Sequence, residues 1–114
     1  MSKDAIMGWK VEFYSEKVLK NIKEWPVQIR AKFTWITNLM EEFGIEQIGM
    51  PHIKALGKGL FEIRAQGNEG IGRAFFCIIQ KKRIIILHEF IKKTQKTPQK
   101  EMEIARKRML EFKE

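Results

Sequence analysis

The sequence of 114 residues predicts a single α+β domain that spans residues 1–114. An early strand pattern precedes two helical patterns, and three strand patterns then follow one another through short connections. A last helical pattern ends the chain. The expected order is β-α-α-β-β-β-α, an antiparallel sheet with two helices on one face and a C-terminal helix. This length suits one domain and is too short for two.

The first half begins with a strand. Residues 9–14 alternate apolar and polar side chains as far as Phe13, and no second strand pattern follows nearby, so the partner strand must come from far along the chain. Ser15 is a suitable N-cap for a first helix, which the pair Trp25-Pro26 ends or kinks. The apolar face of that helix consists of Val18, Ile22 and Trp25.

A second helix follows, and Gly44 is a suitable residue to end it. Its apolar residues recur at spacings of four and three, which places them on one stripe. Trp35 lies off this stripe; we expect it to be buried in an edge contact, and a functional aromatic residue is the alternative. The stripe consists of Ile29, Phe33, Ile36, Met40 and Phe43.

Glycines and Pro51 punctuate residues 44–58, which we interpret as a loop. Residues 60–64, 72–79 and 83–90 are strand patterns, and their short links make them antiparallel neighbours. The last of them is apolar on both faces, so we expect it to be central and covered on both sides.

Strict alternation assigns the faces of these strands. It places Ile84, Ile86, His88 and Phe90 on one face of the last strand, opposite Ile85, Leu87 and Glu89. In normal register, Arg64, Arg73 and one of His88 or Glu89 meet near one corner of the sheet.

The final helix is predicted to open with Thr97 as N-cap and Pro98 as its first residue. We expect it to pack on the domain, a mobile flap being the alternative. Its expected buried stripe is Met102, Ala105, Met109 and Phe112.

The net charge of +8 is unevenly placed. Residues 1–49 carry seven basic and seven acidic side chains, whereas residues 81–100 carry seven basic side chains against Glu89 alone. Such a field attracts polyanions, although a solubilising surface is the plain alternative.

Several function classes find no support in the sequence. One cysteine, Cys77, excludes a disulfide framework and suits a reducing cytoplasm, and no apolar run is long enough to span a membrane. No motif for a metal, a cofactor, a nucleophilic triad or a phosphate-binding loop is present.

The remaining side chains, Arg, Lys and His with Glu as a further candidate, suit metal-free cleavage of RNA by its own 2′-hydroxyl. A base removes the 2′ proton, cations stabilise charge on the phosphate, and an acid protonates the leaving 5′ oxygen. A lysine that is crowded by other cations can have a lowered pKa and exchange protons. Lys92, Lys93 and Lys96 lie close enough in the sequence to crowd one another in this way. Passive phosphate contact is the alternative role for these lysines.

The second half of the chain resembles the phage-derived HigB-like branch of the RelE/ParE toxin superfamily. The resemblance lies in Leu60-Phe61-Glu62-Ile63-Arg64, in Gly72-Arg73 with its apolar run, and in Leu87–Pro98, above all the string Phe-x-Lys-Lys-Thr-x-Lys-Thr-Pro. It extends to residues 50–57 and to the helix at 101–112.

The resemblance implies a toxin of a type II toxin–antitoxin system, an endoribonuclease that acts on mRNA with the ribosome and inhibits translation. It implies a small antitoxin partner of helix-turn-helix type. Gly72-Arg73 stands where the family usually has Tyr-Arg, which removes an aromatic group from that point.

The resemblance implies a site built from cationic side chains. The expected catalytic residues are Arg64, Arg73, Lys92 and Lys93, and the expected RNA contacts are His52, Lys54, Phe90 and Lys96. Two other functions stay open: an RNA- or ribosome-binding module without catalysis, and the gyrase poisoning of the sister branch.

Overall fold

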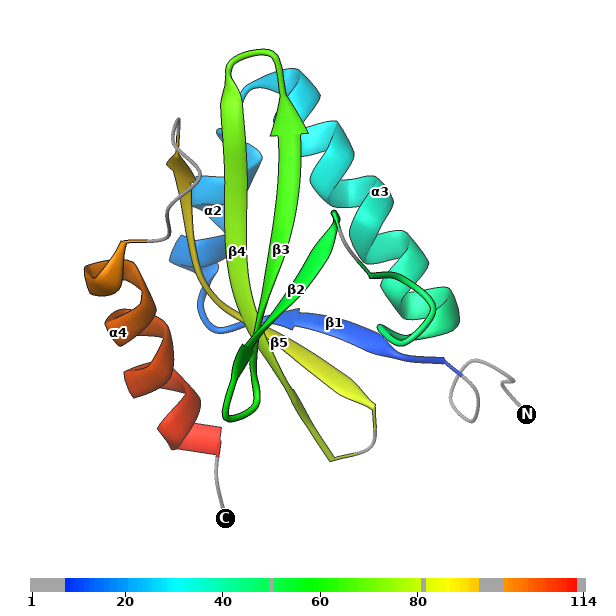
Figure 1. Ribbon diagram of the computed structural model, residues 1–114, viewed down its shortest axis with the longest axis vertical. Helices are drawn as coiled ribbons and strands as arrows, with labels where there is room; N and C mark the ends of the chain where they lie inside the picture. The colour runs from blue at the N-terminus through cyan, green and yellow to red at the C-terminus, as the bar shows by residue number, and fades with distance from the viewer. Residues whose placement is uncertain (1–7, 50, 81, 93–97, 113–114) are drawn as a thin grey trace.

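The computed structural model describes residues 8–49, 51–80, 82–92 and 98–112. It confirms the α+β class and the predicted order of elements, with one strand added. The elements, labelled in Figure 1, are β1 (Lys10–Phe13), α2 (Glu16–Lys23), α3 (Val27–Phe43), β2 (Ile53–Gly57), β3 (Leu60–Gly67), β4 (Gly70–Ile79), β5 (Arg83–Lys92), α4 (Gln99–Met109) and the 3₁₀ turn η1 (Leu110–Phe112).

The five strands form one sheet in the order β1-β5-β4-β3-β2. β3, β4 and β5 form the expected antiparallel meander. β1 pairs with β5 in parallel, so its partner does come from far along the chain. The chain between β1 and β5, which contains α2, α3 and the strands β2 to β4, provides the long connection that this parallel pairing requires.

The prediction of a loop over residues 44–58 is wrong at its end, where β2 pairs antiparallel with β3. The connection is Lys58-Gly59, and both residues have positive φ, 54° and 86°, as the tight turn of a β-hairpin requires. Most residues of β2 are exposed on this edge strand. Because so few of its side chains are buried, the sequence of β2 shows no clear alternation of apolar and polar residues, and the strand was therefore not predicted.

The helices begin and end close to the predicted places. The Oγ of Ser15 accepts a hydrogen bond from the N–H of Val18 at 3.3 Å, and Gly44 ends α3 with φ 77°. α4 begins one residue late, with Pro98 as N-cap, and Thr97 lies outside the described residues.

The apolar stripe of α3 is buried except at its end. Phe43 is 53% exposed and Trp35 is 48% exposed, so both are corrections to the predicted burial. Phe43 is the last residue of α3. Trp35 makes the expected edge contact, with the ring of His52, but remains half exposed.

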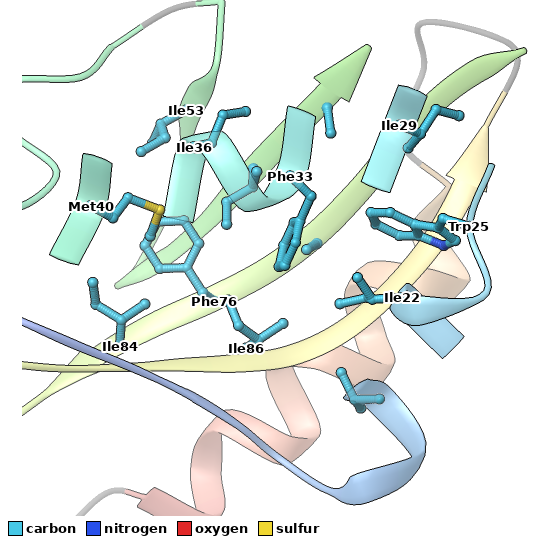
Figure 2. Close-up of a cluster of buried hydrophobic side chains, with 14 of the residues drawn as sticks. Ile22, Trp25, Ile29, Phe33, Ile36, Met40, Ile53, Phe76, Ile84 and Ile86 are labelled. Atoms are coloured by element: carbon cyan, nitrogen blue, oxygen red, sulfur yellow. The ribbon is translucent and has the colours of Figure 1, made fainter. Parts of the chain in front are cut away.

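Two hydrophobic clusters lie on opposite faces of the sheet. The larger one is formed by α2, α3 and the facing side chains of the strands (Figure 2). The smaller one is formed by α4 and the other face of β4 and β5. β5 is therefore central and covered on both sides, as predicted, and α4 packs on the domain on its own side of the sheet (Figure 1).

Gly72 allows the larger cluster to close. A Cβ at this position would lie 2.5 Å from Cγ2 of Ile29 and 2.7 Å from Cζ3 of Trp25. Figure 2 shows Trp25 and Ile29 side by side at this end of the core. The space that a side chain at residue 72 would occupy is filled by Ile29 and by the indole of Trp25, which lies between α2 and α3.

No helix in the described part of the chain is long and apolar enough to cross a membrane.

Gly72→Ala should lower the free energy of unfolding by about 2 kcal/mol, because the added methyl overpacks a filled core. Urea denaturation measures this difference. Gly49→Ala is the matched control, since a Cβ there meets no atom of the described residues within 4 Å. Equal stability of the two variants would contradict the packing described for Trp25 and Ile29.

Candidate functional site

A β-bulge in β5 decides which side chains face α4. Phe75 of β4 pairs with His88, whereas Phe76 pairs with Ile86, which leaves Leu87 as the extra residue. The alternation of side chains is inverted beyond it. Leu87 and Phe90 consequently pack in the same cluster, which strict alternation forbids.

This inversion corrects the predicted faces of β5. His88 and Phe90 do not share a face with Ile84 and Ile86, and they lie instead on the side of α4. The carbonyl of Leu87 accepts a hydrogen bond from Nη1 of Arg108 at 2.7 Å. α4 therefore provides a partner where the ladder of backbone hydrogen bonds is interrupted.

Register rows bring the polar residues of four strands to the face of α4. Residues that are partners across a sheet point to the same side, so each row can be read directly. The rows are Lys54–Glu62–Phe75–His88, then Arg64–Arg73–Phe90, then Gln66–Ile71–Lys92. We call Lys54, Arg64, Arg73, His88 and Lys92 the cationic face.

Arg64 and Arg73 lie directly opposite each other and share one carboxylate. Nη1 of Arg73 donates to Oε2 of Glu62 at 3.0 Å, and Nε of Arg64 lies 3.9 Å from Oε1. The side chains of Arg73 and Glu62 are 1% and 0% exposed, and that of Arg64 is 17% exposed. The predicted corner of arginines exists, with Arg73 inside it and Arg64 at its surface.

An aromatic group and an acid–base pair adjoin the arginines. The rings of Phe75 and Phe90 lie 5.5 Å apart, and that of His88 lies 6.4 Å from Phe75. Nε2 of His88 lies 2.5 Å from Oε1 of Glu101, which α4 contributes. An imidazole held by a carboxylate is an arrangement that can carry a proton.

Glu89 does not belong to this face. Its Oε2 accepts a hydrogen bond from Nδ2 of Asn21 at 2.9 Å, on the side of α2. Burial raises the pKa of Glu89 above its ordinary value, and the hydrogen bond from Asn21 opposes that rise. Of the two sequence candidates for the corner, the structure brings His88 to it and turns Glu89 away.

The other predicted contacts are placed as follows. Lys54 is exposed beside Glu62 in the first row, and Lys92 ends β5 in the third. His52 precedes β2, and its ring contacts Trp35. Phe90 is half-buried between Arg73 and Phe75. Lys93 and Lys96 lie outside the described residues.

Cys77 is not a candidate nucleophile in this structure. It is buried in the cluster under α4, and burial raises the pKa of its thiol to about 11. Only the thiolate is strongly nucleophilic, so this side chain is inert at neutral pH. Among the described residues, no three His, Cys, Asp or Glu side chains gather as metal ligands would.

Sequence reasoning missed Glu62 and Glu101 as parts of the site, and it gave a functional role of Trp35 only as the alternative to burial. Glu62 had a usable signal, since it lies two residues from Arg64 on the same face of a strand. Glu101 had none, because its contact with His88 depends on how α4 packs. The exposure of Trp35 was likewise decided by tertiary contacts.

The comparison with protein families gives one match. Residues 20–110 match the family described as phage derived protein Gp49-like (DUF891). The match covers α3, the whole meander and α4. No curated protein matches the chain.

Glu62→Gln should lower the free energy of unfolding by about 3 kcal/mol, because it leaves the buried charge of Arg73 without its carboxylate. Urea denaturation at neutral pH measures the loss. Glu41→Gln is the control, a less buried carboxylate whose Oε2 accepts a hydrogen bond from the N–H of Val11. A loss no larger than that of the control would show that Glu62 does not hold the arginines.

Glu89→Gln should have the opposite effect at neutral pH and stabilise the protein. The ordinary pKa of this group is 4.5, and burial raises its pKa in the folded state. Below the ordinary pKa both states are protonated and the variant has no advantage. As the pH rises, the unfolded chain ionises first, so the wild type loses stability until the folded pKa is passed.

Urea denaturation of both proteins between about pH 4 and about pH 8 follows this difference. The difference in the free energy of unfolding in favour of Glu89→Gln should grow with pH and then level off. An advantage that grows on acidification would contradict the raised pKa.

Proposed function

This chain belongs to the phage-derived Gp49-like family of the RelE/ParE-like toxin superfamily, and on that premise we propose that it is the toxin of a type II toxin–antitoxin pair. It acts as a HigB-like endoribonuclease that cleaves mRNA with the ribosome and so inhibits translation. Its other partner is a small helix-turn-helix antitoxin.

One observation carries the proposal of RNA cleavage. The bulge in β5 places His88, with its carboxylate Glu101, on the same face and one row away from Arg64 and Arg73. Neighbouring strands lie about 4.8 Å apart and successive residues on one face about 6.7 Å apart, so the backbone of His88 lies about 8 Å from that of Arg73 and about 12 Å from that of Arg64. Side chains that start at these spacings on one face can contact the same stretch of RNA backbone. The set supplies a proton carrier and fixed cations together.

The cations have different roles in this proposal. Arg64, at the surface of the corner, contacts the scissile phosphate and stabilises the charge that develops on its oxygens. Arg73 is buried, and it acts as a support that fixes Glu62 and, through Glu62, the guanidinium of Arg64. Lys92 and Lys54 hold the RNA on either side.

His88 exchanges the protons. When the 2′-hydroxyl attacks the phosphorus, an imidazole can take its proton or protonate the 5′ oxygen that leaves. The carboxylate of Glu101 holds the ring by one nitrogen, which fixes its orientation. The reaction ends with a 2′,3′-cyclic phosphate and a free 5′-hydroxyl, and it consumes no water and no metal.

Arg64→Ala should reduce mRNA cleavage by about 100-fold, because it removes one donor aimed at the developing charge. Wild type, Arg64→Ala and the control Arg83→Ala are expressed separately, and growth, translation and mRNA 5′ ends are followed. Arg83 is a surface arginine at the other end of β5, paired with Glu12. The control should remain as toxic as the wild type.

The proposal fails if wild type and Arg64→Ala arrest growth equally, or if neither changes mRNA. Thermal unfolding of Arg64→Ala is measured alongside, so that lost folding is not taken for lost catalysis.

The burial of Arg73 and its ion pair with Glu62 favour one alternative, an RNA-binding module without catalysis. Such a module would bind RNA with a steep dependence on salt and leave it intact after long incubation with ribosomes. Unchanged mRNA together with inhibited supercoiling would instead indicate a gyrase poison.

A further inference from the structure

A groove of about 500 Å³ opens at the edge of the sheet, beside the cationic face. β2 pairs with β3 only as far as Ile63, and the N–H of Arg64 donates to the carbonyl of His52 at 2.8 Å. Beyond that point β3 faces α3, which packs against it (Figure 1). The groove is lined by Lys32, Pro51, His52, Arg64, Gln66 and Ile71.

Trp35 is not itself a lining residue, but it contacts two of them, and we call its exposed indole the aromatic rim. Its side chain is 48% exposed, and two lining residues contact it. Nζ of Lys32 lies 5.0 Å from the centre of the indole, and the ring of His52 lies 5.2 Å away at 81°. The indole is therefore held in place on the surface by its neighbours while about half of it stays open to a ligand.

The chemistry of the lining suits an anion with an aromatic part. It contains Lys32, Arg64 and His52, and none of its side chains is a carboxylate. Lys32 makes no ion pair with a carboxylate of the described residues. The volume is in the range that holds a nucleotide-sized ligand.

Arg64 connects this groove to the site proposed above. Arg64 lines the groove, and its Nε lies 3.9 Å from Oε1 of Glu62, the carboxylate that binds Arg73. The backbone of an RNA strand that passes from the groove over Arg64 therefore continues onto the cationic face.

We propose that the groove binds one nucleotide of single-stranded RNA next to the scissile phosphate. The base stacks on the open part of the Trp35 indole, and the phosphate is bound by Lys32 and Arg64. This inference rests on the proposed endoribonuclease function and adds a base-binding subsite to it. A double helix does not fit, because its bases are already stacked and paired.

An acidic peptide is the other ligand that cations attract. Its carboxylates would pair with Lys32 and Arg64, but they would not stack on an exposed indole. The aromatic rim therefore favours RNA over protein as the occupant of the groove.

The test uses a fluorescein-labelled, 2′-O-methyl single-stranded RNA of ten nucleotides, which lacks the 2′-hydroxyl and cannot be cleaved. Fluorescence anisotropy measures its affinity for the full chain. Trp35→Ala should weaken binding about 10-fold, because base–aromatic stacking is lost, and Trp35→Phe should restore most of it. Phe43→Ala, an equally exposed aromatic at the far end of α3, should leave the affinity unchanged.

Three outcomes overturn the subsite. They are equal affinities of wild type and Trp35→Ala, equal losses for Trp35→Ala and Phe43→Ala, and equal competition by polyglutamate and unlabelled 2′-O-methyl RNA. The last would assign the groove to an acidic peptide. A duplex of the same sequence should bind equally to wild type and Trp35→Ala.

The failure of the proposed function has a separate signature. If unmodified mRNA stays intact when it is incubated with the wild-type protein and ribosomes, the proposed cleavage is refuted. This holds whether or not Trp35→Ala lowers the affinity for RNA. Conversely, efficient cleavage with no effect of Trp35→Ala on affinity refutes only the subsite.

Discussion

The burial of β5 on both faces is the constraint on which the rest of the structure depends. Its run of isoleucines and Leu87 has apolar side chains on each side, so both faces must be covered. α2 and α3 cover one face, and α4 covers the other. The position of α4, and with it the carboxylate of Glu101, follows from this requirement.

The site begins where that two-sided burial ends. Beyond the bulge at Leu87, β5 changes from apolar to polar, and the inverted alternation sends His88, Phe90 and Lys92 toward the arginines of β3 and β4. If the ladder continued from Ile86 without a bulge, Ala74 would pair with His88 and Arg73 with Glu89, so His88 would face α2 and Glu89 would lie opposite Arg73. The bulge therefore determines whether a base or an acid lies on the face of the arginines.

Charge compensation shapes this corner as much as charge itself. A guanidinium that is 1% exposed is costly to bury, and the carboxylate of Glu62 offsets much of that cost. The result is a rigid pair under a more exposed Arg64. In the proposed site Arg64 contacts the phosphate, and the buried pair of Glu62 and Arg73 fixes the orientation of Arg64. Precise binding sites need this kind of support from a second layer of residues.

The sequence alone determined the class and order of the elements, because the periods of its apolar residues are those of helices and strands. The caps at Ser15 and Gly44, the burial of β5 and the facing pair Arg64–Arg73 followed from the same local rules. The family resemblance was readable from strings that lie within the part of the chain that matches the family. What the tertiary structure decided was the strand β2, the bulge at Leu87, and the contacts of Glu62, Glu101 and Trp35. Each of these depends on the register between strands or on the packing of a helix, and such relations between distant residues leave no period in the sequence.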